Sequence, residues 1–220
     1  MPDRFLIAYV GRSGSSYLQG ALDSHPQCTC LGEILWQHQD LEDVEAYVER
    51  SLDVADKTDV ALGFKFGNTH IIKYPNLRPY LLAQKFRVIH LTRLNRIEQY
   101  VSMRLAFENN SWRSDDGPWH IHTLTIELDH MDEFLNRFEL HDRIIKKYFE
   151  SFDTLNVTFE GLLQGGMPRV LEFLDLPYAE LVSPFKRQGG SPLRDVVRNY
   201  DELIRHLRGT PYEPFVGADL

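Results

Sequence analysis

The feature that most constrains the fold is a strand-like run near the start of the chain, followed by a glycine turn and a helix-like pattern. Phe5–Val10 is an apolar run of strand length, rich in β-branched and aromatic residues. Gly11–Ser16 follows with glycines, serines and an arginine, and apolar residues recur at helical spacing from Leu18. We predict a buried strand, a tight turn and a helix start. Together they form an anion cradle, because the first N–H groups of a helix have no partner within it.

The loop differs from the two best-known phosphate motifs. It lacks the lysine and the second glycine at the spacing that G-x-x-x-x-G-K-[ST] requires, and it is not G-x-G-x-x-G. The hydroxyls of Ser13, Ser15 and Ser16 add donors, and Arg12 adds a planar charged fork. The alternative interpretation is a plain glycine turn before a capped helix.

Composition limits the class of protein. The chain has 220 residues, 43% of them hydrophobic, and a formal net charge of −8. We expect one globular domain over residues 1–220 and no nucleic-acid partner, since such binders usually carry a basic face. No leader or membrane-length apolar run is present in the sequence, so we expect a cytoplasmic protein. We expect no metal site, and the oligomeric state stays open.

Strand-like and helix-like segments alternate along the chain, which predicts a doubly wound α/β fold, with a mainly five-stranded parallel sheet covered by helices on both faces. The predicted strands are residues 5–10, 28–31, 60–66, 86–92 and 155–159. A first helix is predicted to begin near Leu18. The other predicted helices are residues 41–52, 75–84 (interrupted by Pro79), 95–108, a long segment from about 131 to 152, 168–174 and 200–207. Ligands bind such sheets at the carboxyl ends of the strands, so the segments after each strand are the candidate site.

Two of these segments carry a family resemblance. Gly11–Leu18 resembles the 5′-phosphosulfate loop of sulfotransferases that use 3′-phosphoadenosine 5′-phosphosulfate (PAPS), and His90–Ser102 resembles their 3′-phosphate segment. Asn156–Leu162 is similar to a strand-end signature of the family. Lys186-Arg187 and Val197–Leu203 resemble the C-terminal part of bacterial carbohydrate sulfotransferases. The resemblance implies a P-loop-type fold, which agrees with the strand, turn and helix predicted from the residues.

The resemblance also implies a role for each matching residue, with PAPS as the donor. It places the 5′-phosphosulfate on the loop, the 3′-phosphate on Arg93 and Ser102, and Lys186 and Arg187 over the nucleotide. The loop residues that it assigns to the donor are Gly11, Arg12, Ser13, Gly14, Ser15, Ser16 and Tyr17. The alternatives are a surface salt bridge for Arg93 and a solvent-facing position for Ser102.

Sulfuryl transfer needs positive charge near the leaving phosphate and a base for the acceptor hydroxyl. Arg12 is the first candidate for the charge, and Lys65, near the end of the third strand, is the second. Glu33 follows the second strand and is the candidate base, with His38 and His70 as rivals. The alternatives are a lysine with its head in water and a surface glutamate.

The acceptor is expected to be a small molecule or a glycan, and a carbohydrate or glycolipid hydroxyl is favoured. Trp112, Trp119 and His120 in the long loop could stack on a sugar, or the tryptophans could anchor the loop to the core. Two other functions stay open. One is a P-loop kinase, which would need an Asp at a strand end for Mg²⁺, and the other is a non-catalytic nucleotide-binding module.

Overall fold

The computed structural model describes residues 2–36, 41–53, 59–112, 116, 119–185 and 191–216. The chain divides into two compact units. The first unit comprises Met1–Thr92 and His141–Pro184, and the second comprises Arg93–Leu140 and Phe185–Leu220. The expectation of a single domain over residues 1–220 stays a prediction.

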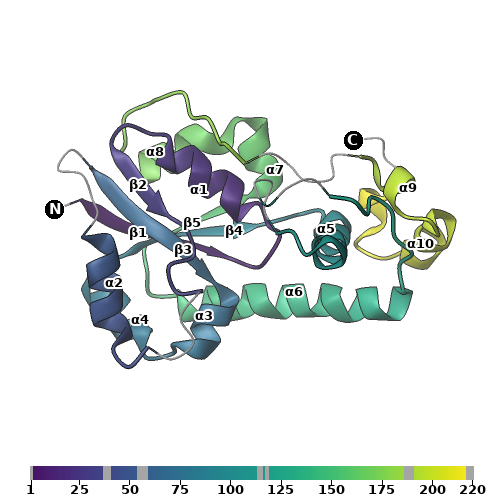
Figure 1. The fold of residues 1–220 in the computed structure, drawn as a ribbon, viewed down its shortest axis with the longest axis horizontal. Coiled ribbons are helices and arrows are strands. Elements are labelled where there is room, and N and C mark those ends of the chain that lie inside the picture. The colour runs from purple at the N-terminus through teal and green to yellow at the C-terminus, as the bar shows by residue number, and fades with distance from the viewer. Residues whose placement is uncertain are drawn as a thin grey trace. The chain divides into compact units, whose positions relative to one another are not determined.

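The first unit is built on a five-stranded sheet (Figure 1). Its strands are β1 (Asp3–Tyr9), β2 (Cys28–Leu31), β3 (Ala61–Gly67), β4 (Arg87–Thr92) and β5 (Thr154–Thr158). They lie in the order β2-β3-β1-β4-β5, and every neighbouring pair is parallel. The predicted five-stranded parallel sheet is confirmed, and each predicted strand lies within two residues of its observed bounds.

Helices cover both faces of the sheet within the first unit. They are α1 (Ser15–Asp23), α2 (Val44–Leu52), α3 (Asn68–Lys73), α4 (Leu77–Ala83), α7 (Phe159–Gly161), the π-helical turn η1 (Leu162–Gly166), α8 (Met167–Phe173) and the last turns of α6 (Leu128–Tyr148). On one face Phe5 and Ile7 join a core that includes Leu18 and Leu22 of α1 and residues of α8. On the other, the rings of Phe66 and Tyr148 stack at 6.1 Å. The doubly wound α/β fold is therefore confirmed.

The second unit is mainly helical. It contains α5 (Arg96–Asn109), the first turns of α6, α9 (Leu193–Val196), α10 (Tyr200–Leu207) and the 3₁₀ turn η2 (Glu213–Phe215). Asn95 begins α5 as its N-cap, because its side chain accepts a hydrogen bond from the N–H of Glu98. Asn199 ties the C-terminal segment to the approach of α6 by bonding both the N–H and the carbonyl of Ile126.

Three local differences from the predicted helices have physical causes. Helix α2 begins at Val44 rather than at residue 41, because the Asp43 side chain caps it by accepting from the N–H of Ala46. Helix α3 was not predicted, since its six residues are too short to show a periodic pattern. Helix α4 begins at Leu77 rather than at residue 75, and Pro79 does not interrupt it. Pro79 lies in its first turn, where proline is tolerated because that N–H needs no helical partner.

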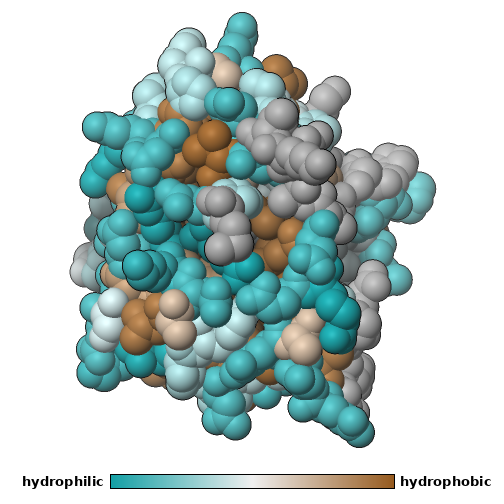
Figure 2. All heavy atoms as spheres, turned by 90° about the vertical axis from the view of Figure 1, so that its left-hand side faces the viewer, coloured by the Kyte–Doolittle hydropathy of each residue, from teal (hydrophilic) through white to brown (hydrophobic). Residues whose placement is uncertain are grey.

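The surface seen in Figure 2 is mainly hydrophilic, and its apolar side chains form small separate patches. This face is the side of Figure 1 on which α2 and α4 lie. Among the described residues, no helix combines the length and the apolar character needed to cross a bilayer.

Candidate functional site

The strand order places the predicted site at a switch point of the sheet. From β1 the chain crosses to β2 and β3 on one side and then to β4 on the other. The anion loop follows β1, the turn that carries Glu33 follows β2, and α3 follows β3. All three segments belong to the first unit and leave the same edge of the sheet, because the strands are parallel.

The loop after β1 has the backbone of an anion cradle. Arg12 and Gly14 both adopt left-handed conformations, with φ of 64° and 89°. Gly14 is the N-cap of α1, and within the described part of the chain no side chain caps that helix. The first N–H groups of α1 therefore have no helical or side-chain partner, and successive amides in such a turn form a concave site for a negative ion.

Ser13 gives a second indication of a ligand at this loop. Its side chain is fully buried, and its Oγ forms no hydrogen bond with any residue that the structure describes. A buried hydroxyl without a partner loses its hydration without compensation, at a cost of roughly 1–3 kcal/mol. A bound anion beside the loop would supply the missing acceptor.

Phe159, which directly follows β5, packs against the anion loop. A Cβ added to Gly14 would lie 2.2 Å from the Phe159 ring, so only glycine fits there. The same ring meets Tyr17 edge-on at 5.9 Å. The segment Asn156–Leu162, singled out in the sequence as a strand-end signature, therefore contacts the anion loop directly.

Glu33 and Lys65 form an ion pair beside the loop, in which Lys65 is buried and Glu33 is partly exposed. Lys65 Nζ lies 2.8 Å from Glu33 Oε1 and donates to Ser16 Oγ at 3.1 Å. Lys65 is 5% exposed, and its ammonium lies 5.1 Å from the centre of the Tyr9 ring. The alternative of a lysine with its head in water is therefore wrong. The structure brings together Glu33, Lys65 and the loop, three of the segments that the sequence assigned to one site.

The ion pair sets the charge of Glu33. Burial pushes the pKa of Glu33 up, but the charge and hydrogen bond of Lys65, with a hydrogen bond from Tyr9, outweigh it, and the net pKa is lowered. Burial also raises the pKa of Tyr9 well above its usual value, and the nearby Glu33 raises it further. Glu33 is thus a carboxylate at neutral pH, and Tyr9 is a neutral hydroxyl.

His70, a rival base, lies in α3 and is buried. Its Nδ1 accepts a hydrogen bond from the N–H of Gly67 at 3.1 Å, so the ring proton belongs on Nε2. Burial lowers the pKa of His70 to about 4 and outweighs the opposing charge of Glu33. Within the described residues Nε2 has no hydrogen-bond partner. The ring is therefore neutral, with one nitrogen already occupied as an acceptor.

Arg93 and Ser102 belong to the second unit. Arg93 is buried and forms an ion pair with Glu98 in the first turn of α5, so it is not the surface salt bridge offered as the alternative. Ser102 is half-buried on the same helix. Their assignment to the 3′-phosphate stays a prediction. Lys186, Arg187 and His38 lie outside the described residues.

The aromatic residues of the long loop have different surroundings. Trp119 is 7% exposed and its indole N–H donates to the carbonyl of Ser111, so it anchors the loop. Trp112 is partly exposed and packs edge-on against Phe107, with ring centres 4.7 Å apart. His120 is exposed. These residues also belong to the second unit.

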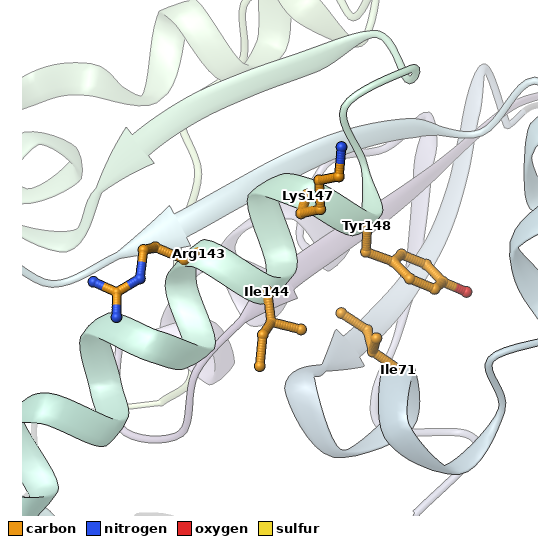
Figure 3. A pocket seen from close by; sticks show the side chains of 5 residues that line it. All are labelled: Ile71, Arg143, Ile144, Lys147 and Tyr148. Atoms are coloured by element: carbon orange, nitrogen blue, oxygen red, sulfur yellow. The ribbon is translucent and has the colours of Figure 1, made fainter.

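A separate pocket of about 360 Å³ lies in the first unit between α3 and the last turns of α6. Figure 3 shows the side chains that line it, which are Ile71 of α3 and Arg143, Ile144, Lys147 and Tyr148 of α6. None of the predicted site residues lines it. In the part of the chain that the structure describes, no three His, Cys, Asp or Glu side chains gather as a metal site would need.

Sequence reasoning missed two residues of the site. Tyr9 appeared as part of an apolar strand, yet its hydroxyl reaches Glu33. Phe159 was noted only within a strand-end signature, although it packs against the loop. An aromatic residue at the last position of a strand that precedes a glycine-rich turn is the one sequence signal that marks Tyr9.

Comparison with known proteins gives relatives along nearly the whole chain. Nodulation protein H of Rhizobium meliloti (strain 1021) is 27% identical over 239 aligned residues, covering 97% of this chain and 95% of that protein. Nodulation protein H of Rhizobium tropici is 25% identical over 241 aligned residues, covering 99% of this chain and 94% of that protein. No protein-family model matches the chain.

Solved structures show the same fold. A sulfotransferase from Alicyclobacillus acidocaldarius superposes with a TM-score of 0.55 at 15% identity, covering 98% of this chain and 92% of that one. Mouse sulfotransferase SULT7A1, crystallised with PAP, superposes with a TM-score of 0.53 at 14% identity. The match covers 80% of this chain and 60% of the mouse chain. The predicted resemblance is confirmed: the chain has the fold of these sulfotransferases and is similar to nodulation protein H along nearly its whole length.

Proposed function

We propose that the chain transfers a sulfuryl group from PAPS to a hydroxyl of a carbohydrate or glycolipid. The observation that carries the proposal is the position of Lys65, whose ammonium contacts both the Glu33 carboxylate and Ser16 of the anion loop. A carboxylate able to accept a proton therefore lies next to a cradle able to hold the donor. The mouse structure, which was solved with PAP, supports a donor of this type.

Gly11–Tyr17 binds the 5′-phosphosulfate of the donor. The unpartnered amides at the start of α1, the buried Ser13 hydroxyl and the left-handed turn at Gly14 suit the 5′-phosphosulfate. Arg12 supplies a guanidinium to the charge that gathers on the leaving phosphate. In the second unit Arg93 and Ser102 take the 3′-phosphate, and to do so Arg93 exchanges its contact with Glu98 for the ligand. Lys186 and Arg187 complete the donor set that the resemblance implies.

Glu33 takes the proton from the acceptor hydroxyl. The acceptor oxygen forms a bond to sulfur as the bond from sulfur to the 5′-phosphate oxygen breaks. The products are a sulfate ester and adenosine 3′,5′-bisphosphate, and the hydroxyl proton goes to a Glu33 oxygen. The Glu33 side chain keeps 30% of its surface exposed, so an acceptor can reach it. A positioned base of this kind contributes about 10²–10⁴-fold to the rate.

Lys65 holds the base in place and adds positive charge at the loop. It keeps the pKa of Glu33 below its usual value, so that the carboxylate is ionised before the acceptor arrives. Its second hydrogen bond, to Ser16 Oγ, fixes the base relative to the start of α1. We assign Lys65 to charge stabilisation of the transferring group as well.

His70 is the poorer base on geometric grounds. Its Nδ1 is occupied by the N–H of Gly67, and its Nε2 carries the ring proton, so neither nitrogen is ready to accept another. Glu33 is ionised and partly exposed. The contrast favours Glu33 as the proton acceptor.

The test is transfer of ³⁵S from labelled PAPS to a panel of neutral oligosaccharides, with calorimetric titration of adenosine 3′,5′-bisphosphate in parallel. We expect bisphosphate binding that does not require Mg²⁺ and label in at least one sugar. Binding that depends on Mg²⁺ would support the kinase alternative. Micromolar binding without transfer to any acceptor would support the non-catalytic binding module.

A further inference from the structure

Trp36 is an exposed aromatic residue at the candidate site whose position no step of the reaction explains. Its side chain is 64% exposed, the most of any tryptophan in the described residues. Large aromatic side chains usually bury most of their surface, so one held in water beside a proposed base is a candidate contact for a ligand. A single exposed apolar residue is not unusual by itself, and its position decides the argument.

That position is fixed by the turn that carries Glu33. The N–H of Trp36 donates to the carbonyl of Glu33 at 3.0 Å, which makes residues 33–36 a hydrogen-bonded turn. Such a turn brings its first and fourth Cα atoms within about 7 Å of each other. Glu33 and Trp36 therefore belong to one hydrogen-bonded turn of four residues.

The turn is tied to the rest of the first unit at three points. Leu35 is fully buried, the Tyr47 hydroxyl donates to the carbonyl of Ile34 at 3.1 Å, and the N–H of Lys65 donates to the carbonyl of Gly32 at 3.1 Å. The exposure of Trp36 is thus the consequence of an anchored backbone.

The backbone next to Glu33 is open. A Cβ added to Gly32 would meet nothing within 4 Å among the described residues, and the φ of Gly32 is not in the left-handed region. A ligand can therefore approach the turn from this side without displacing a side chain. The missing Cβ leaves room directly before the residue that accepts the proton.

We infer that Trp36 is the platform for the acceptor sugar, with the C–H face of a pyranose ring on the indole and one ring hydroxyl directed to Glu33. The inference rests on the proposed function and specifies its acceptor as a pyranoside. Trp36 acts as a specificity-determining residue, since it binds the acceptor ring and takes no part in proton transfer. An indole face favours a rigid ring with an apolar face over a flexible alcohol.

The experiment measures kcat and KM with ³⁵S-labelled PAPS and three acceptors: maltotetraose, cellotetraose and N-acetylchitotetraose. Trp36→Ala is compared with Trp36→Phe and with Tyr178→Ala, which removes an aromatic side chain that is 78% exposed elsewhere in the same unit. We expect Trp36→Ala to raise the acceptor KM at least tenfold with the KM of PAPS unchanged. Trp36→Phe should recover part of the loss, and Tyr178→Ala should match the wild type.

Three other outcomes would contradict the platform or the proposed function. An acceptor KM that changes less than twofold in Trp36→Ala, while the wild type sulfates one of the sugars, overturns the platform and leaves the proposed function intact. Wild-type protein that binds adenosine 3′,5′-bisphosphate but sulfates none of the three sugars overturns the pyranoside platform and supports the non-catalytic binding module. Wild-type protein that does not bind the bisphosphate removes the proposed function itself.

Discussion

Lys65 Nζ lies 2.8 Å from Glu33 Oε1, and the same ammonium donates to Ser16 Oγ at 3.1 Å. One buried side chain therefore joins the turn after β2 to the first turn of α1. Removing one partner of such a pair leaves an uncompensated charge, so the pair is a sensitive point of the first unit. It also ties the proposed base to the proposed donor loop.

Glu33→Gln should keep the shape of the donor site, because the amide oxygen can still accept the hydrogen bond from Lys65, but it lowers stability by leaving the Lys65 charge unpaired, and the amide cannot accept the proton. We expect kcat to fall by about 10²–10⁴-fold with the affinity for adenosine 3′,5′-bisphosphate unchanged. Steady-state kinetics and calorimetry measure the two effects, with Glu45→Gln on the exposed face of α2 as the control. Full activity in Glu33→Gln would move the base to another residue.

Lys65→Met should raise the pKa of Glu33. Burial already pushes that pKa up, and Lys65 supplies the main opposing effect, so its loss leaves burial to act. A raised pKa means that Glu33 becomes protonated at higher pH, and the acid limb of the kcat profile should move upward. The control is Lys146→Met on the exposed side of α6. An acid limb at the same pH in Lys65→Met would contradict the pairing.

Gly14→Ala should destabilise the first unit by roughly 2–5 kcal/mol. The added Cβ would meet the Phe159 ring at 2.2 Å, and alanine is strained at a φ of 89°. Gly11→Ala is the matched control, since a Cβ there meets nothing within 4 Å in the described structure and its φ is not left-handed. Urea unfolding of both variants gives the comparison. Equal stability of the two would mean that Phe159 does not brace the loop.

His70 should make folding stability depend on pH on the acid side. Burial holds the pKa of His70 at about 4 in the folded state, whereas an unfolded histidine titrates near 6.5. The unfolded state therefore takes up the proton first, and stability is lost as the pH falls from about 6.5 to 4, by up to roughly 3 kcal/mol. His70→Gln should flatten this part of the curve of unfolding free energy against pH. An identical slope in the variant would show that the ring is not held neutral.

Much of the fold was predictable from the sequence, because buried parallel strands appear as short apolar runs. Phe5–Val10 and Phe86–Thr92 correspond to β1 and β4 for this reason. The pairing of Glu33 with Lys65 was not predictable, since it depends on the sheet order that sets β2 beside β3. The exposure of Trp36 depends on the turn that anchors Leu35, and no periodic pattern marks a turn of four residues.

Arg12→Ala and Arg93→Ala should each weaken binding of adenosine 3′,5′-bisphosphate by at least about 100-fold, because each removes a charged hydrogen bond to phosphate. Arg93→Lys keeps a positive charge that can pair with Glu98 but lacks the planar guanidinium. It therefore separates the effect of losing the guanidinium from the effect of losing the ion pair. Arg208→Ala, an exposed position, is the control. Calorimetry at one ionic strength gives the comparison, and tight binding retained in both alanine variants would remove the donor assignment.

The proposed function places the 5′-phosphate of the donor on the loop Gly11–Ser16, against the first amides of α1. The most direct measurement is a crystal structure with adenosine 3′,5′-bisphosphate bound. We predict its 5′-phosphate within hydrogen-bond distance of the N–H groups at the start of α1 and of the Ser13 hydroxyl. A nucleotide bound elsewhere, with this loop unoccupied, would contradict the account.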